Sequence, residues 1–123
     1  MTVRLVLDTS AICAYAAGSI HVGEVLAELE FEGVRAALPL LCLIEAGTTV
    51  KDQRLLDVLA EHPVIGLAEM EFAGWRQISA AATILGTIGR ACAALPVVRG
   101  QAGYVLTADP HVYETAGIDC IAV

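Results

Sequence analysis

The sequence predicts an α/β protein with a mostly parallel central sheet that helices cover on both faces. Short apolar runs of strand length alternate along the chain with segments of helical periodicity, which is the pattern of a parallel sheet. The strand candidates are continuous apolar runs, as in sheets buried on both faces. The length of 123 residues is that of one domain. We therefore expect residues 1–123 to form a single α/β/α sandwich.

The chain is expected to begin with one strand and two helices. Residues 3–7 form an apolar run that stops at Asp8, as a buried strand would. Residues 11–17 are expected to be helical as far as Gly18. Within residues 21–31, apolar side chains recur at i, i+3, i+4 and i+7, which predicts an amphipathic helix.

A second strand and two more helices are expected to follow. Residues 34–38 have the composition of a strand. Pro39 is well placed to open a helix, and residues 40–50 are apolar nearly all round, so this helix should be buried. Residues 55–59 suggest another short helix, and residues 63–67 a third strand.

The C-terminal half repeats the alternation. Residues 72–85 keep helical spacing until Gly86, and Pro96 is expected to end or kink a further helix over residues 88–95. The last expected elements are a strand at 104–107, a short helix at 110–116 and a strand at 120–123.

The charge balance disfavours a protein that binds bare duplex DNA. The net charge is −7, and the chain has a single lysine, Lys51, and six arginines, whereas such binders usually present a basic face. Nucleic acid stays compatible with this acidity if a divalent cation bridges carboxylates and phosphate. The apolar content of 57% exceeds what one core needs and predicts a homodimer.

Cysteine usage and the apolar runs indicate a cytoplasmic protein without a membrane span. None of the four cysteines belongs to a C-x-x-C pair, so buried free thiols are expected. Asp8 interrupts the N-terminal apolar run, and the longest apolar stretch is too short to cross a bilayer.

Three carboxylates are candidates for a functional site. Asp8 and Asp109 lie at or just past the ends of two expected strands, although both also stand where a helix cap would. Glu45 lies on the expected buried helix with no cation among its helical neighbours, so it points either to solvent or into a polar pocket. Sites in parallel sheets form at the carboxyl ends of the strands.

If these acids converge, a divalent cation would remove their mutual repulsion. Carboxylate oxygens suit Mg²⁺ or Mn²⁺. Such an ion activates water and stabilises charge on a phosphoryl group. The chemistry indicated is phosphodiester hydrolysis, with Asp8, Glu45 and Asp109 as catalytic metal ligands.

Four motifs resemble a known family. V-L-D-T-S-A-I at 6–12, L-C-L-I-E-A-G at 41–47, Y-V-L-T-A-D-P at 104–110 and G-I-D-C-I-A-V at 117–123 occur in order over the whole chain. Together they resemble a PIN domain, an α/β/α nuclease with a parallel sheet and an acidic cluster for Mg²⁺ or Mn²⁺. Many bacterial members are toxins of toxin–antitoxin pairs that cleave RNA as dimers. The resemblance therefore implies an RNA substrate and an antitoxin partner.

The resemblance also assigns residues. Asp8, Glu45 and Asp109 would be metal ligands or organise the metal-bound water. Their orientation would depend on neighbouring hydroxyl groups. The candidates for that role are Thr9, Ser10, Thr87 and Thr107.

The chain departs from the family at one acidic position. PIN domains usually place another aspartate at the start of the helix before the last strands, yet no acid occurs here between Glu71 and Asp109. Thr87 is the first choice for that position, and Ile88, Gly89 and Ala91 are the alternatives. Loss of one ligand would weaken metal binding or abolish turnover.

Two other functions are compatible with parts of the sequence. A receiver-type phosphoacceptor domain also uses acids at strand ends, but it needs an acidic pair after the first strand and a lysine near the last. This chain has only Asp8 at the first place, and its lysine is Lys51. The second alternative is a catalytically degraded PIN-like protein with a binding or regulatory role, which the missing acid favours.

Overall fold

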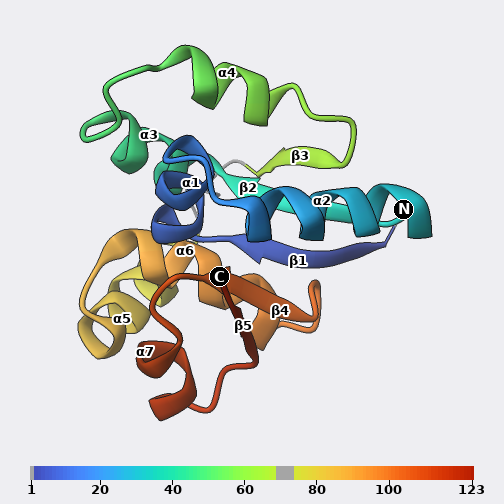
Figure 1. Cartoon of the computed structure of the whole chain (residues 1–123). Coiled ribbons are helices and arrows are strands. Elements are labelled where there is room, and N and C mark those ends of the chain that lie inside the picture. The colour runs from blue at the N-terminus through green and yellow to red at the C-terminus, as the bar shows by residue number, and fades with distance from the viewer. Residues whose placement is uncertain (1, 69–73) are drawn as a thin grey trace.

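A computed structural model describes residues 2–68 and 74–123 of the chain (Figure 1). In this part of the chain, five parallel strands form one sheet in the order β3-β2-β1-β4-β5. The strands are β1 (Val3–Leu7), β2 (Arg35–Pro39), β3 (Ile65–Ala68), β4 (Tyr104–Thr107) and β5 (Cys120–Ala122). The predicted fold class, an α/β protein with a parallel sheet between helices, is confirmed.

Helices cover both faces of this sheet. In the described residues they are α1 (Thr9–Ala16), α2 (Ile20–Glu32), α3 (Leu40–Gly47), α4 (Arg54–Ala60), α5 (Trp75–Leu85), α6 (Ile88–Val98) and α7 (Pro110–Thr115). Helix α1 packs against α2 and α4, which lie over β2 and β3, while α6 packs across β1, β2 and β4. Because crossovers between parallel strands are right-handed, the connections toward β3 and toward β4 place their helices on opposite faces. Helix α3 contacts both α1 and α6, so it bridges the two layers.

The direction of the chain across the sheet reverses between β1 and β4. From β1 the chain proceeds to β2 and β3 on one side, and it then returns to β4 and β5 on the other (Figure 1). Parallel sheets of this kind bind ligands outside the carboxyl ends of the strands at such a reversal. The register pairs Leu7 with Leu106, and the N–H of Asp8 donates to the carbonyl of Leu106 at 3.2 Å. The residues that follow β1 and β4 therefore lie side by side.

The predicted end of the sixth helix is wrong. Pro96 lies inside α6, which continues to Val98. Pro96 lacks the N–H that would form one helical hydrogen bond, but only two residues of the helix follow it. Its carbonyl accepts from the N–H groups of Gln101 (2.8 Å) and Ala102 (3.2 Å), which stabilises the end of the helix.

The other expected elements are present, with shifts of a few residues at their ends. Helix α3 ends at Gly47 rather than at residue 50. Gly86 ends α5 as expected and has a φ of 97°, a left-handed conformation that glycine adopts readily. Helix α5 begins at Trp75, and the start proposed at residue 72 lies outside the described residues.

The core is apolar, and the cysteines are free thiols as predicted, but the prediction that all four are buried is wrong. Cys42 is fully buried, whereas the other three cysteines are partly exposed. In the two described ranges, no single helix is both long and apolar enough to cross a membrane.

Candidate functional site

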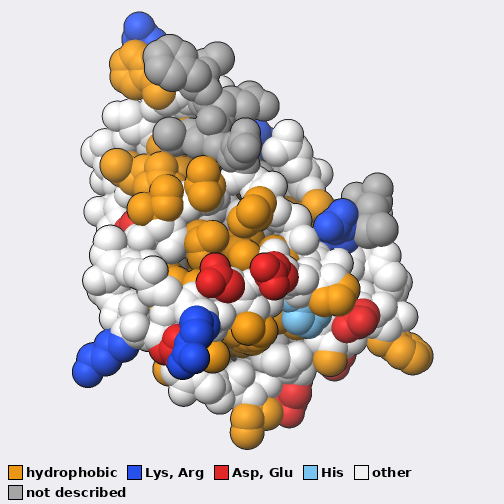
Figure 2. All heavy atoms as spheres, turned by 90° about the horizontal axis from the view of Figure 1, so that it is seen from above, with side chains coloured by type: hydrophobic (Ala, Val, Ile, Leu, Met, Phe, Trp, Pro, Cys, Tyr) orange, Lys and Arg blue, Asp and Glu red, His pale blue; other side chains and the backbone are white. Residues whose placement is uncertain are grey.

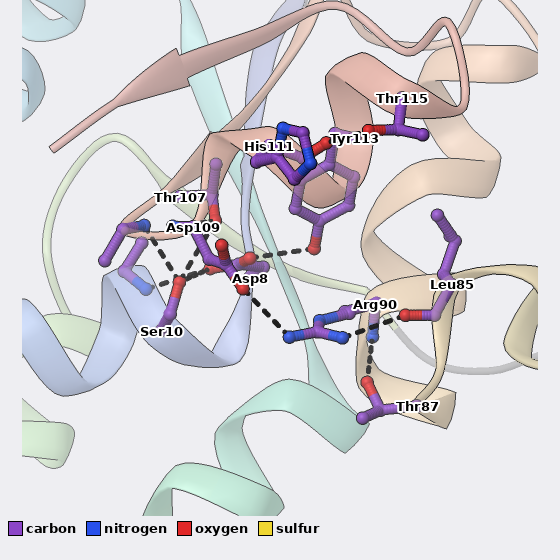
Figure 3. Close-up of polar contacts among 12 residues, drawn as sticks. Asp8, Ser10, Leu85, Thr87, Arg90, Thr107, Asp109, His111, Tyr113 and Thr115 are labelled. Carbon is purple, nitrogen blue, oxygen red and sulfur yellow. Dashed lines mark hydrogen bonds and ion pairs between the residues drawn. The ribbon is translucent and has the colours of Figure 1, made fainter.

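Asp8 is held by three hydrogen bonds at the end of β1. It is the N-cap of α1, and its Oδ1 accepts from the N–H of Ala11 (2.9 Å) and from the hydroxyl of Ser10 (2.6 Å). Its Oδ2 accepts from the hydroxyl of Tyr113 at 2.8 Å (Figure 3). The residue is only 3% exposed. Asp8 is therefore both a helix cap and part of a larger polar network.

Ser10 and Thr107 connect the ends of β1 and β4. Their hydroxyl oxygens are 3.1 Å apart. The N–H of Ala108 donates to Ser10 Oγ at 2.9 Å, and the N–H of Asp109 donates to Thr107 Oγ1 at 2.9 Å (Figure 3). The two hydroxyls expected beside the acids thus fix the backbone that carries Asp109.

Asp109 makes an ion pair instead of capping a helix. It stands at the N-cap position of α7, but its side chain makes no capping hydrogen bond. Its Oδ2 lies 3.0 Å from Nη2 of Arg90, whose Nη1 donates to the carbonyl of Leu85 at 2.9 Å (Figure 3). The capping alternative is thus wrong for the side chain of Asp109. No pattern in the sequence indicated this pair, because the two residues lie on separate elements.

Glu45 reaches the same region from α3 with one oxygen unpaired. Its Oε1 is buried and has no hydrogen-bond partner among the described residues, and the same is true of Thr9 Oγ1. Both atoms lie against Gly89. A Cβ built on Gly89 would overlap Glu45 Oε1, and it would lie 2.9 Å from Thr9 Oγ1. Glu45 is therefore directed into the junction of α1, α3 and α6 rather than toward solvent.

On α6, the residue that lies against Glu45 is Gly89. Thr87, the first choice from the sequence, is exposed at the N-cap of α6, and its hydroxyl accepts from the N–H of Arg90 at 3.1 Å. Gly89, one of the alternatives left open, is buried and faces Glu45 and Thr9. A side chain that entered the acidic region from α6 would therefore start at residue 89.

Asp8 and Glu45 both affect the buried thiol of Cys42. Burial raises the pKa of the Cys42 thiol from 9.0 to about 12, and the negative charges of Asp8 and Glu45 act in the same direction. The thiol donates to the carbonyl of Gly89 at 3.2 Å. Burial, followed by the charge of Asp8, also raises the pKa of Tyr113, so this phenol stays a hydrogen-bond donor. The negative charges of Asp8 and Glu45 therefore act at the same end of the sheet.

The arrangement fits a divalent cation in one respect. The unpaired Oε1 of Glu45 is a buried carboxylate oxygen that lacks a positive partner, which is costly unless a cation or a proton is supplied. Among the described residues Asp8 has no cationic partner, whereas Asp109 is paired with Arg90. Across residues 2–68 and 74–123, no three His, Cys, Asp or Glu side chains are grouped closely enough to hold a metal ion. Asp8 and Glu45 are thus the residues available to a cation, and Asp109 would first have to leave Arg90.

No protein-family model matches the chain, and no curated protein is significantly similar to it.

Proposed function

We propose that the chain is a PIN-type ribonuclease that depends on Mg²⁺ or Mn²⁺. The observation that carries the proposal is that acids follow two adjacent strands at the reversal of the sheet. Asp8 and Asp109 follow the adjacent strands β1 and β4, and Glu45 brings an unpaired buried oxygen to the same end. Three of the four motifs that resemble PIN domains, at 6–12, 41–47 and 104–110, lie on the elements that form this site. A toxin of a toxin–antitoxin pair, with an antitoxin partner and a homodimeric state, is the form of the proposal that the resemblance favours.

The residues of the chain would have distinct roles in this function. Asp8 and Glu45 would hold the cation, and Asp109 would complete the site. A bound divalent ion supplies an activated water and stabilises charge on the scissile phosphate. Ser10 and Tyr113 fix the two oxygens of Asp8, so the carboxylate does not need to reorganise when a ligand binds.

Cleavage of single-stranded RNA tests the proposal. The protein should cleave slowly with Mn²⁺ or Mg²⁺ and not with a chelator. Asp8→Asn should abolish cleavage, because an amide is a poorer ligand for a hard cation, while its side-chain oxygen still caps α1. Asp52→Asn is the matched control, since Asp52 pairs with Arg54 at the surface, and it should cleave like the wild type. Cleavage that survives both the chelator and Asp8→Asn would contradict the proposal.

Two observations favour a second candidate, a PIN-like protein that binds RNA or a protein partner without cleaving it. Gly89 supplies no ligand at the position that faces Glu45, and Arg90 already neutralises Asp109. Calorimetric titration with Mn²⁺ separates the two candidates. An absence of both metal binding and cleavage, with RNA still bound, would support the non-catalytic candidate.

A further inference from the structure

We propose that Arg90 is a built-in counter-cation of the acidic site and competes with a divalent metal ion for Asp109. The inference rests on the proposed function, because it concerns how the same acids accept a metal. It assigns Arg90 a role in setting metal affinity, as a positioning residue that acts through Asp109.

The guanidinium is anchored at the site and is not a freely moving surface group. Nη2 contacts Asp109 Oδ2 at 3.0 Å, and Nη1 donates to the carbonyl of Leu85, the last residue of α5, at 2.9 Å. A Cβ built on Gly86 would lie 3.2 Å from Nη1, so the turn between α5 and α6 passes close to the guanidinium. The side chain of Arg90 is 32% exposed and that of Asp109 is 50% exposed, so both can be reached by an ion from solvent.

Arg90 places a positive charge at the acidic site through its ion pair with Asp109. In the described part of the chain, the other ion pairs are Arg4 with Glu32 and Arg54 with Asp52, and neither includes a residue of the acidic site. The positive charge of Arg90 also lowers the pKa of Tyr113, against the larger raising effects of burial and of Asp8. Its field therefore reaches the phenol that holds Asp8.

A metal ion bound at the site would meet two costs that arise from Arg90. It would have to displace the guanidinium from Asp109, and it would bind beside a charge of the same sign. Both costs disappear when residue 90 is neutral. Metal affinity should therefore be lower in the wild type than the acids alone would give.

Titration calorimetry with Mn²⁺ on the full chain tests the inference directly. Arg90→Gln should bind Mn²⁺ about tenfold more tightly than the wild type or better, because a positive charge near the ion is removed. Arg90→Lys should stay closer to the wild type than Arg90→Gln, because it keeps the charge but loses the planar fork. The matched control is Arg99→Gln at the C-cap of the same helix, which should leave the affinity unchanged.

Thermal unfolding gives a second readout that does not depend on catalysis. Because a ligand that binds only the folded state raises the melting temperature, Mn²⁺ should raise it more in Arg90→Gln than in the wild type. Arg90→Met repeats the test with the apolar stem retained, in case the glutamine variant folds poorly. Unchanged Mn²⁺ affinity in folded Arg90→Gln and Arg90→Met would overturn the inference. If the wild type then still cleaves RNA with metal, the proposed function stands, whereas a lack of binding and cleavage in every variant removes both.

Discussion

Gly89 lies in the first turn of α6 against the carboxylate of Glu45, so a methyl group at this position tests how closely the two helices approach. Its Cβ would overlap Glu45 Oε1 and approach Cδ at 2.9 Å. We expect Gly89→Ala to lower the free energy of unfolding by about 1–3 kcal/mol, because overpacking outweighs the gain in helix propensity. Urea denaturation measures the change.

Gly23 in α2 provides the matched control for Gly89. A Cβ there meets nothing within 4 Å, so Gly23→Ala should raise the free energy of unfolding by about 0.5–1 kcal/mol. When Glu45 is already replaced by alanine, Gly89→Ala should lower the free energy of unfolding by less than it does in the wild type, because the overlapping carboxylate is absent. If Gly89→Ala and Gly23→Ala changed the free energy of unfolding equally, the result would contradict the packing seen between α3 and α6.

The hydroxyl of Tyr113 fixes Asp8 from the far side of the site. It donates to Oδ2 at 2.8 Å, and the residue is fully buried. Tyr113→Phe should therefore lower the free energy of unfolding by about 1.5–3 kcal/mol, the usual range for a hydrogen bond to a charged group. Tyr104→Phe on the exposed end of β4 should change the free energy of unfolding by less than about 0.5 kcal/mol. If urea denaturation gave the same change for Tyr113→Phe and Tyr104→Phe, the hydrogen bond from Tyr113 to Asp8 would contribute nothing to stability.

The buried thiol of Cys42 makes stability depend on alkaline pH. Its pKa is raised from 9.0 to about 12 on folding, so the folded state keeps the proton where the unfolded chain loses it. The resulting stabilisation is complete below pH 9 and is lost as the pH rises toward about 12, with a slope of up to about 1.4 kcal/mol per pH unit. Cys42→Ala should reduce this slope. Burial also raises the pKa of Cys92 and of Cys120, so some slope should remain, whereas an unchanged slope would contradict the assignment to Cys42.

At the scale of elements, α6 shows how tertiary contacts override a local preference. The helix carries Pro96 inside its last turn and continues to Val98. Pro96→Ala should raise the free energy of unfolding by about 1 kcal/mol, a part of the roughly 3 kcal/mol penalty that proline carries in a helix interior. Pro110→Ala is the comparison, because Pro110 is the first residue of α7, where proline is favourable. The urea midpoint should rise for the first variant and stay or fall for the second.

The positions of the strands and helices along the chain followed from the sequence because they depend on local patterns. The run before Asp8 and the Asp109–Pro110 pair marked the ends of β1 and β4, and both acids lie there. The surroundings of Glu45 depend on how closely α3 approaches α6, a distance that periodicity does not contain. The Arg90–Asp109 pair likewise depends on the turn after α5 that brings Arg90 to the carbonyl of Leu85. The sequence therefore predicted where Asp8 and Asp109 lie in the fold, but it did not predict that Arg90 pairs with Asp109.

At the scale of the whole molecule, the apolar excess of the sequence has a counterpart on the surface. Hydrophobic side chains gather on the side formed by β3, α3 and α4, which Figure 2 views from above. The exposed members are Leu40, Ile44, Leu55, Val58 and Leu67. A contiguous exposed apolar patch commonly marks an interface, and most soluble oligomers are homo-oligomers, with twofold dimers the commonest. We therefore expect this patch to lie in the homodimer interface.

Light scattering at micromolar concentration tests this interface. The wild type should have the mass of a dimer, and Val58→Lys should shift it toward the monomer, because a charge buried in an apolar interface without a partner is costly. Phe31→Lys is the control, since Phe31 is 94% exposed on α2, away from the patch, and should stay dimeric. Val58 lies on α4, outside the acidic site, so Mn²⁺ binding should be the same in the monomeric variant. A wild type of monomer mass would contradict the dimer, and a dimer that persists in Val58→Lys would place the interface elsewhere.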